Sequence, residues 1–200
     1  MDHLPRIGYP KLIDGGIFHK YSAIFMEIMY QIKNTNASPA ISRLCEIFAN
    51  ILGEKEVVCI CRNLRDFDIC DYEPIETEGN TILTIKPTNK GTEAFGIFFD
   101  LWQKYREMIL AGMDAKKIIL CEIEYSKSGK AYFTEKGFTE IFKKVFTPDE
   151  LKDLVEWLIA EDVLDAIDHE LIYLSNYGKV TSAECTIWQN CRNDLLAEGF

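Results

Sequence analysis

Apolar residues recur at three- and four-residue steps in the first quarter of the chain, which indicates amphipathic helices. One stripe predicts a core helix over 17–33, after an extended lead-in over 1–16. Ser38 and Pro39 supply an N-cap and a first-turn proline for a second helix that ends near Leu52. Two packed helices are therefore expected at the N-terminal end.

The middle of the chain favours strands. Val57 to Leu64 is β-branched and apolar, which predicts a strand, and an acidic loop is expected over 66–79. Polar and apolar residues alternate from Thr81 to Lys86, and Asn89 to Gly91 predicts a hairpin turn into a returning strand over 94–99.

Similar signals continue through the third quarter of the chain. A helix is expected over 102–113, followed by a strand from Ile118 to Tyr125. The turn Ser126 to Gly129 predicts that residues 131–134 form the hairpin mate of that strand.

The most specific local signal is a capping box at Thr147 to Glu150, with Pro148 in the first turn of a helix. Leu171 to Leu174 and Lys179 to Thr181 read as a second hairpin, and an amphipathic helix is expected over 183–196. Ser126 to Lys130 and Ser175 to Lys179 share an S-x-x-G-K pattern, which two independently chosen turns explain as well as a duplication does.

These elements predict an α+β fold. The two N-terminal helices pack on an antiparallel sheet in a core domain over 17–113, and a smaller half over 114–200 holds hairpins and the capped acidic helix. Because no proline- or glycine-rich linker marks the boundary, a single domain is the alternative.

Composition is that of an ordinary folded protein, with 48% hydrophobic and 27% charged residues. No apolar run reaches the length of a membrane span and no secretion signal is recognised, so a soluble, cytoplasmic protein is expected. The seven cysteines are an odd number in a chain of 200 residues and are interpreted as reduced core thiols.

Negative charge is concentrated in one segment of the chain. The formal net charge is −10, and residues 147–170 hold nine carboxylates against the single Lys152. Such a field repels nucleic acid and attracts a basic protein surface, although a solvated helix face is the simpler alternative. The candidate partner-binding residues are Asp149, Asp153, Glu156, Glu161 and Asp165.

Catalytic motifs are not recognised, since neither a phosphate-binding loop nor a nucleophile elbow occurs in the sequence. Candidate metal ligands are the exposed-looking carboxylates Asp66, Asp68, Asp71, Glu122 and Glu124. The last two resemble a nuclease strand, but Ser126 stands where that pattern needs lysine.

Two further groups of titratable residues are candidate sites. Cys59, Cys61 and Cys70 lack the spacing of structural zinc sites. His169 lies between two carboxylates that favour its protonated form, which suits either acid–base chemistry or a plain surface position.

Two resemblances rest on element order alone. Residues 147–181 follow an order similar to a winged helix, and residues 17–113 follow one similar to sensor domains of the GAF or PAS type. The sequence thus favours an acidic protein-interaction module, of the inhibitor or immunity type, with no cofactor. A small-molecule sensor is the alternative, and a metal-dependent hydrolase is the second alternative.

Overall fold

The computed structural model describes residues 20–198 except 78, 126–131, 134 and 168–170. The chain is α+β and divides into two compact units between Gly112 and Met113, here called the N-terminal and the C-terminal unit. In the described ranges, no helix has the length and apolar character that crossing a bilayer requires.

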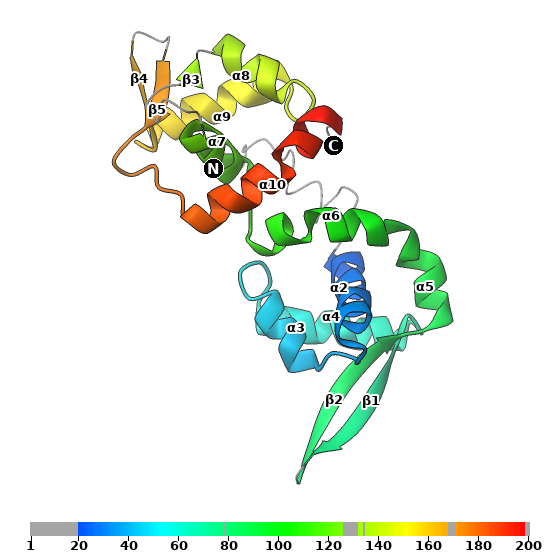
Figure 1. Ribbon diagram of the computed structural model, residues 1–200. Helices are drawn as coiled ribbons and strands as arrows, with labels where there is room; N and C mark the ends of the chain where they lie inside the picture. The colour runs from blue at the N-terminus through cyan, green and yellow to red at the C-terminus, as the bar shows by residue number, and fades with distance from the viewer. Residues whose placement is uncertain (1–19, 78, 126–131, 134, 168–170, 199–200) are drawn as a thin grey trace. The chain divides into compact units, whose positions relative to one another are not determined.

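The N-terminal unit begins with three helices, continues with a hairpin and ends with helices again (Figure 1). Its elements are α2 (Lys20–Thr35), α3 (Ile41–Ile47), α4 (Glu54–Asp66), β1 (Cys70–Thr77), β2 (Asn80–Pro87), α5 (Asn89–Phe95), the short η1 (Gly96–Phe98) and α6 (Phe99–Leu110). Strands β1 and β2 are antiparallel, with Cys70 opposite Pro87. Ala40, just before α3, makes an antiparallel bridge to Thr84 of β2.

The C-terminal unit follows a similar order of elements, with a strand between its first two helices and one helix after the hairpin. These are α7 (Ala115–Tyr125), β3 (Tyr132–Phe133), α8 (Glu135–Phe142), α9 (Pro148–Ala160), β4 (Leu164–Ile167), β5 (Leu171–Leu174) and α10 (Ser182–Glu198). The sheet order is β3-β5-β4, with both pairs antiparallel. Each unit thus has a first helix, a short extended segment, two further helices and a hairpin, and Ala40 with its bridge is the extended segment of the N-terminal unit.

Equivalent backbone turns connect the third helix to the hairpin in both units. Asp68 and Asp162 have left-handed φ values of 58° and 56° at the ends of α4 and α9. After the hairpin, Gly91 and Gly178 lie so close to this turn that an added Cβ would be 2.2 Å from the carbonyl oxygen of Ile69 or Val163. Only glycine fits such an approach.

A buried carboxylate joins the first and last helices of the N-terminal unit. Glu27 of α2 is 0% exposed and accepts hydrogen bonds from Trp102 Nε1 at 3.1 Å and from Arg106 Nε and Nη2 at 2.7 and 2.8 Å. Burial works to lower the pKa of Arg106, but the hydrogen bonds and charge of Glu27 outweigh it and raise that pKa. The charge of Glu27 is thus fully compensated, which a buried carboxylate requires.

The C-terminal unit has an equivalent cluster, built from a second glutamate, tryptophan and arginine. Glu122 of α7 is also 0% exposed and accepts from Trp188 Nε1 at 2.9 Å and from Arg192 Nε and Nη2 at 2.7 Å each. The indole rings have equivalent neighbours too, because Phe48 and Phe142 lie 6.2 and 6.3 Å from the rings of Trp102 and Trp188. Each unit therefore has its own core around an aromatic pair and a buried ion pair.

Three segments expected to be strands are helical. Val57 to Leu64 belongs to α4, Ile118 to Tyr125 is α7, and residues 94–99 continue α5 into α6. In α4 the buried residues Val57, Ile60, Cys61 and Leu64 follow a helical period, which outweighed β-branched composition. The element order behind the sensor resemblance is consequently not the observed one.

The hairpin assignments also needed correction. The expected loop over 66–79 holds β1, and Asn89 to Gly91 opens α5 with Thr88 as its N-cap. Leu171 to Leu174 is strand β5 as predicted, but its partners are β3 and β4, and residues 179–181 form no strand. The predicted strand over 81–86 is confirmed, as are the helices over 102–113 and 183–196 to within a few residues.

Candidate functional site

Helix α9 begins at the capping box that the sequence predicted. Thr147 Oγ1 accepts from the Glu150 backbone N–H, and the Glu150 carboxylate accepts from the Thr147 backbone N–H at 2.9 Å. Leu151, Leu154 and Leu158 are buried on one side of the helix. The helix is thus fixed at its N-terminus and along its apolar side, and its opposite side is free to carry polar residues.

Three predicted partner-binding residues share that opposite side. Asp149, Asp153 and Glu156 are all exposed and lie at helical steps of four and three residues. We call these three residues the acidic face of α9. Their spacing places three carboxylates along about two turns of helix, which makes a concentrated negative field.

The other two candidates lie elsewhere in the unit. Glu161 is the C-cap residue of α9 and is exposed. Asp165 is exposed on β4, next to Ala166, which contributes to the wall facing α9. Because neighbouring strand residues point to opposite sides of a sheet, Asp165 points away from α9 and does not extend the acidic face.

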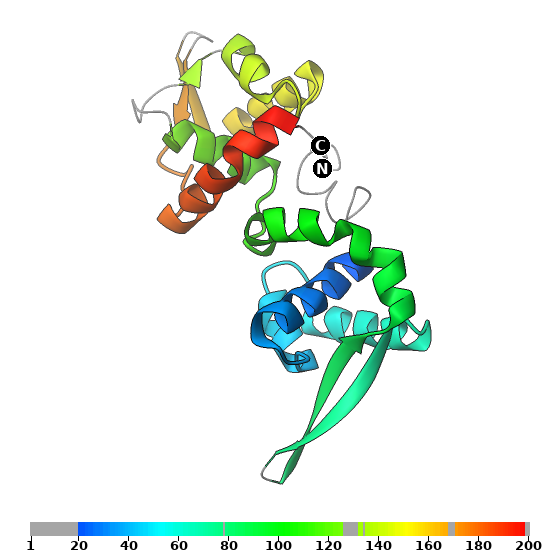
Figure 2. The same ribbon diagram turned by 45° about the vertical axis from the view of Figure 1, so that its right-hand side comes forward.

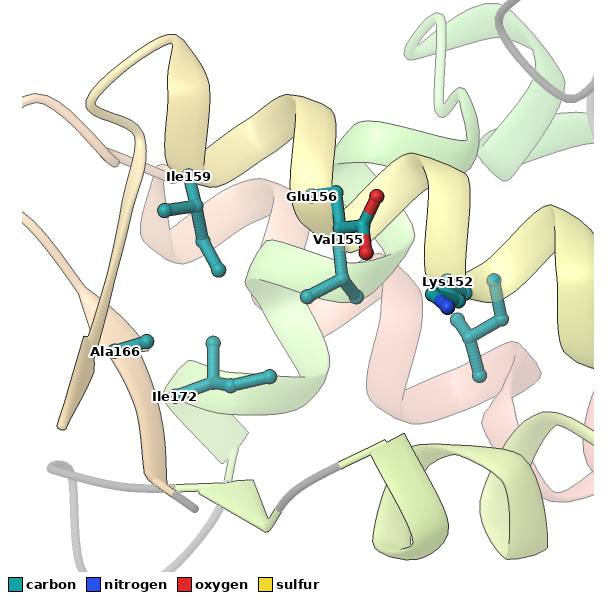
Figure 3. A pocket seen from close by; sticks show the side chains of 7 residues that line it. Lys152, Val155, Glu156, Ile159, Ala166 and Ile172 are labelled. Atoms are coloured by element: carbon teal, nitrogen blue, oxygen red, sulfur yellow. The ribbon is translucent and has the colours of Figure 1, made fainter. Parts of the chain in front are cut away.

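An apolar groove separates α9 from the β4–β5 hairpin (Figure 3). Its volume is about 120 Å³, and Ala166 and Ile172, which are paired across the two strands, form the hairpin side. The whole lining is Leu151, Lys152, Val155, Glu156, Ile159, Ala166 and Ile172. Glu156 therefore belongs both to the acidic face and to the groove, so charge and apolar surface meet at one place.

The N-terminal unit presents a basic stripe at the equivalent place. Lys55, Cys59 and Arg62 are exposed on α4, at the same helical steps as the acidic face of α9. Arg65 is exposed one turn later and pairs with Asp66 at 2.7 Å. The sequence prediction missed this stripe because it assigned the segment to a strand, although the period of the buried residues was the available signal.

The hairpin beside the basic stripe is acidic. Asp71, Glu73 and Glu76 are exposed on β1, and Lys86 of β2 lies 3.5 Å from Glu73. Carboxylates next to a basic helix weaken its attraction for phosphates. The third helices of the two units, α4 and α9, thus expose opposite charges. In the N-terminal unit, the surface around α4 carries both basic and acidic residues.

The candidate metal ligands do not converge. Asp66 is paired with Arg65, Asp68 is at the turn after α4, and Asp71 is on β1. Glu122 is occupied by Trp188 and Arg192, whereas Glu124 is exposed two residues further on the same helix. In the described parts of the chain, no group of three His, Cys, Asp or Glu side chains is placed to hold a metal ion.

The three cysteines of the candidate zinc group also differ in how far they are buried. Cys59 is exposed and Cys61 is buried on α4, and Cys70 is buried at the start of β1. Burial raises the pKa of Cys61 and of Cys70 to about 12, which keeps both thiols protonated. His3, His19 and His169 lie outside the described residues.

No protein-family model matches the chain, and neither a curated protein nor a solved structure matches it. Two surfaces stand out, the acidic face of α9 with its groove and the basic stripe of α4.

Proposed function

We propose that the chain is a protein-interaction module, of the inhibitor or immunity type, whose C-terminal unit binds a basic surface of a target protein. The observation that carries this proposal is the position of three exposed carboxylates on one side of α9, directly beside an apolar groove. A helix face that only kept the protein in solution would need no adjoining apolar hollow.

The two parts of this surface do different work in binding. The acidic face attracts a basic partner over a distance and speeds association at low salt. The groove excludes water from a small apolar contact, which slows dissociation. The partner that fits both is a protein segment with lysine or arginine residues flanking one branched aliphatic or aromatic side chain, because about 120 Å³ holds roughly one such group.

Charge reversal tests the acidic face. The variant carries Asp149→Lys, Asp153→Lys and Glu156→Lys, and it is used against a partner recovered from the source cell and then purified. We expect association to slow strongly and its salt dependence to flatten. The matched control is Glu93→Lys, Asp100→Lys and Glu107→Lys, which makes the same change in net charge at exposed positions of the N-terminal unit. Equal loss of binding in both variants would leave the site on α9 unsupported.

Filling the groove tests its share separately. Ala166→Leu adds apolar volume on the hairpin side and changes no charge. We expect faster dissociation with unchanged association and unchanged salt dependence, measured by binding kinetics at low and high salt. If the dissociation rate is unchanged, the groove does not take part in binding, and the partner contacts only the charged residues.

A second candidate function is nucleic-acid contact by the N-terminal unit. The observation that favours it is the basic stripe of α4, on the third helix of a unit whose order of elements resembles a winged helix. The acidic residues of β1 argue against it. The test is fluorescence anisotropy with duplex DNA at low and physiological salt, using Lys55→Glu with Arg62→Glu; binding that these changes do not weaken would exclude α4 as the contact.

A further inference from the structure

Two contacts hold α7 and α10 together on either side of a pair of cysteines. Lys117 Nζ of α7 lies 2.7 Å from Glu184 Oε1 of α10, and Trp188 Nε1 of α10 donates to Glu122 of α7 at 2.9 Å. Cys121 stands between Lys117 and Glu122, one turn after the lysine. Cys185 stands between Glu184 and Trp188. The two helices thus run side by side with the cysteines between the two contacts.

The two thiols meet in this interval. Both are free, Cys121 is buried and Cys185 is partly exposed. The two side chains interact electrostatically across the pair of helices. Burial raises the pKa of both thiols, and the interaction with Cys185 further raises that of Cys121, whereas the interaction with Cys121 works to lower that of Cys185. Cys185 is therefore the thiol that solvent reaches and that loses its proton more readily.

We propose that Cys121 and Cys185 form a reversible disulfide that ties α7 to α10 when a small-molecule disulfide is present. The pair belongs to the C-terminal unit alone among the described residues. Met26 lies one residue before Glu27, as Cys121 does before Glu122. Phe99 lies three residues before Trp102, as Cys185 does before Trp188. The contact between the thiols is therefore not a requirement of the shared fold, since the N-terminal unit builds the same cluster without it.

The reaction balances with oxidised glutathione as the oxidant. The Cys185 thiolate attacks one sulfur of oxidised glutathione, which forms a mixed disulfide and releases one glutathione thiolate. Cys121 then loses its proton and attacks Cys185 Sγ, which forms the protein disulfide and releases the second glutathione thiolate. The two cysteines lose two electrons and two protons in total, and oxidised glutathione becomes two thiols.

A disulfide here would stabilise the C-terminal unit. It would close the long loop between α7 and α10, which contains α8, α9 and the hairpin, and such a cross-link restricts the unfolded chain. It would also hold the helices that carry Glu122, Trp188 and Arg192. Since α9 lies within the closed loop, the oxidised unit would present the acidic face from a more stable scaffold.

The test uses the full chain treated with oxidised glutathione, then alkylated, digested without reductant and analysed by mass spectrometry. We expect a peptide pair joined through Cys121 and Cys185 that has lost two hydrogen masses, and a thermal midpoint that rises by several degrees and returns on reduction. Cys121→Ala and Cys185→Ala should each abolish the linked peptides and the rise. Cys59→Ala, at an exposed thiol, should abolish neither.

Three outcomes would overturn the proposal. These are a stable glutathione adduct at Cys185 with no transfer to Cys121, a link between other cysteines only, and a rise in the midpoint that persists in Cys185→Ala. If Cys121→Ala lowers stability by itself, the peptide analysis of Cys185→Ala still decides, because that side chain is partly exposed and its removal leaves the buried position unchanged.

Discussion

Trp188 donates its indole N–H to the Glu122 carboxylate, as Trp102 does to Glu27 in the other unit. In both units an arginine one turn beyond the tryptophan donates two further hydrogen bonds to the carboxylate. A buried carboxylate with three charge-assisted or indole donors is costly to disturb, because removing one partner leaves a buried charge without compensation.

Glu122→Ala should therefore destabilise the C-terminal unit by about 3–5 kcal/mol, the usual cost of breaking a buried ion pair. Glu27→Ala should have a similar effect on the N-terminal unit. Chemical denaturation followed by tryptophan fluorescence measures both, with Trp102 reporting on the N-terminal unit. The control is Glu124→Ala at an exposed position of α7, which should change stability by about 0.5 kcal/mol or less. A small effect of Glu122→Ala would contradict the assigned role.

Glycine is required where the last part of each unit meets the turn after the third helix. Gly91→Ala would place its Cβ 2.2 Å from the Ile69 carbonyl oxygen and 2.6 Å from a ring carbon of Phe25. The backbone must shift, so we expect a loss of about 1–3 kcal/mol in the free energy of unfolding. Gly178→Ala should behave alike. Gly96→Ala is the control, since its nearest neighbour would be 3.6 Å away and its φ of −58° is helical; a loss there as large as at Gly91 would refute the steric explanation.

Glu184 makes the stability of the C-terminal unit depend on acid pH. Burial works to raise its pKa, but hydrogen bonds from Lys117 and Thr181 outweigh this and lower it from the ordinary value of 4.5. A lowered pKa in the folded state adds stability that is complete above about pH 4.5 and is lost as the pH falls through the folded value. The thermal midpoint of Glu184→Gln should lie below that of the wild type near pH 7, and the gap should close as the pH falls through the lowered pKa of Glu184. A gap that is constant with pH would exclude the linkage.

Chelators should leave the folded state unchanged. Of the candidate ligands, Asp66 and Glu122 pair with arginine, and Asp68, Asp71 and Glu124 lie at the turn after α4, on β1 and on α7. We expect the same thermal midpoint with and without a chelating agent, measured by calorimetry on protein purified without added metal. Stoichiometric zinc or manganese in that protein, with a midpoint that drops on chelation, would contradict this expectation.

Sequence patterns predicted the helix with the capping box at Thr147 and the strand that alternates, and they failed where composition and period disagreed. The cap predicted at Ser38 was wrong, because α3 has Ala40 as its N-cap and ends at Ile47, before Leu52. Val57, Val58 and Ile60 favour a strand, yet tertiary packing of Val57, Ile60, Cys61 and Leu64 selects a helix. Glu122 looked exposed because a carboxylate usually is, and its burial depends on Arg192, which is 70 residues away.

The shared plan of the two units was also visible only in part. The S-x-x-G-K pattern occurs at Ser126 and at Ser175, but the first of these segments lies outside the described residues. The structural counterpart of Ser175 to Gly178 is Thr88 to Gly91, where Thr88 Oγ1 and Ser175 Oγ each accept from the backbone N–H of the glycine. The spacing of the carboxylates predicted the acidic face of α9. The groove beside it could not be predicted in this way, because it depends on where the β4–β5 hairpin lies against α9.

The hairpin β1–β2 extends beyond the helices of its own unit (Figures 1 and 2). Ile75, Ile82 and Leu83 are 40–43% exposed near its end, and among the described residues β1 has a single partner strand. Exposed apolar residues beside an open strand edge are a template for fibril-like pairing between chains. Pro74 lacks the N–H that such pairing needs, and Glu73 and Glu76 on either side of it repel an identical edge. Those three residues therefore oppose the pairing of two chains through the open edge of β1.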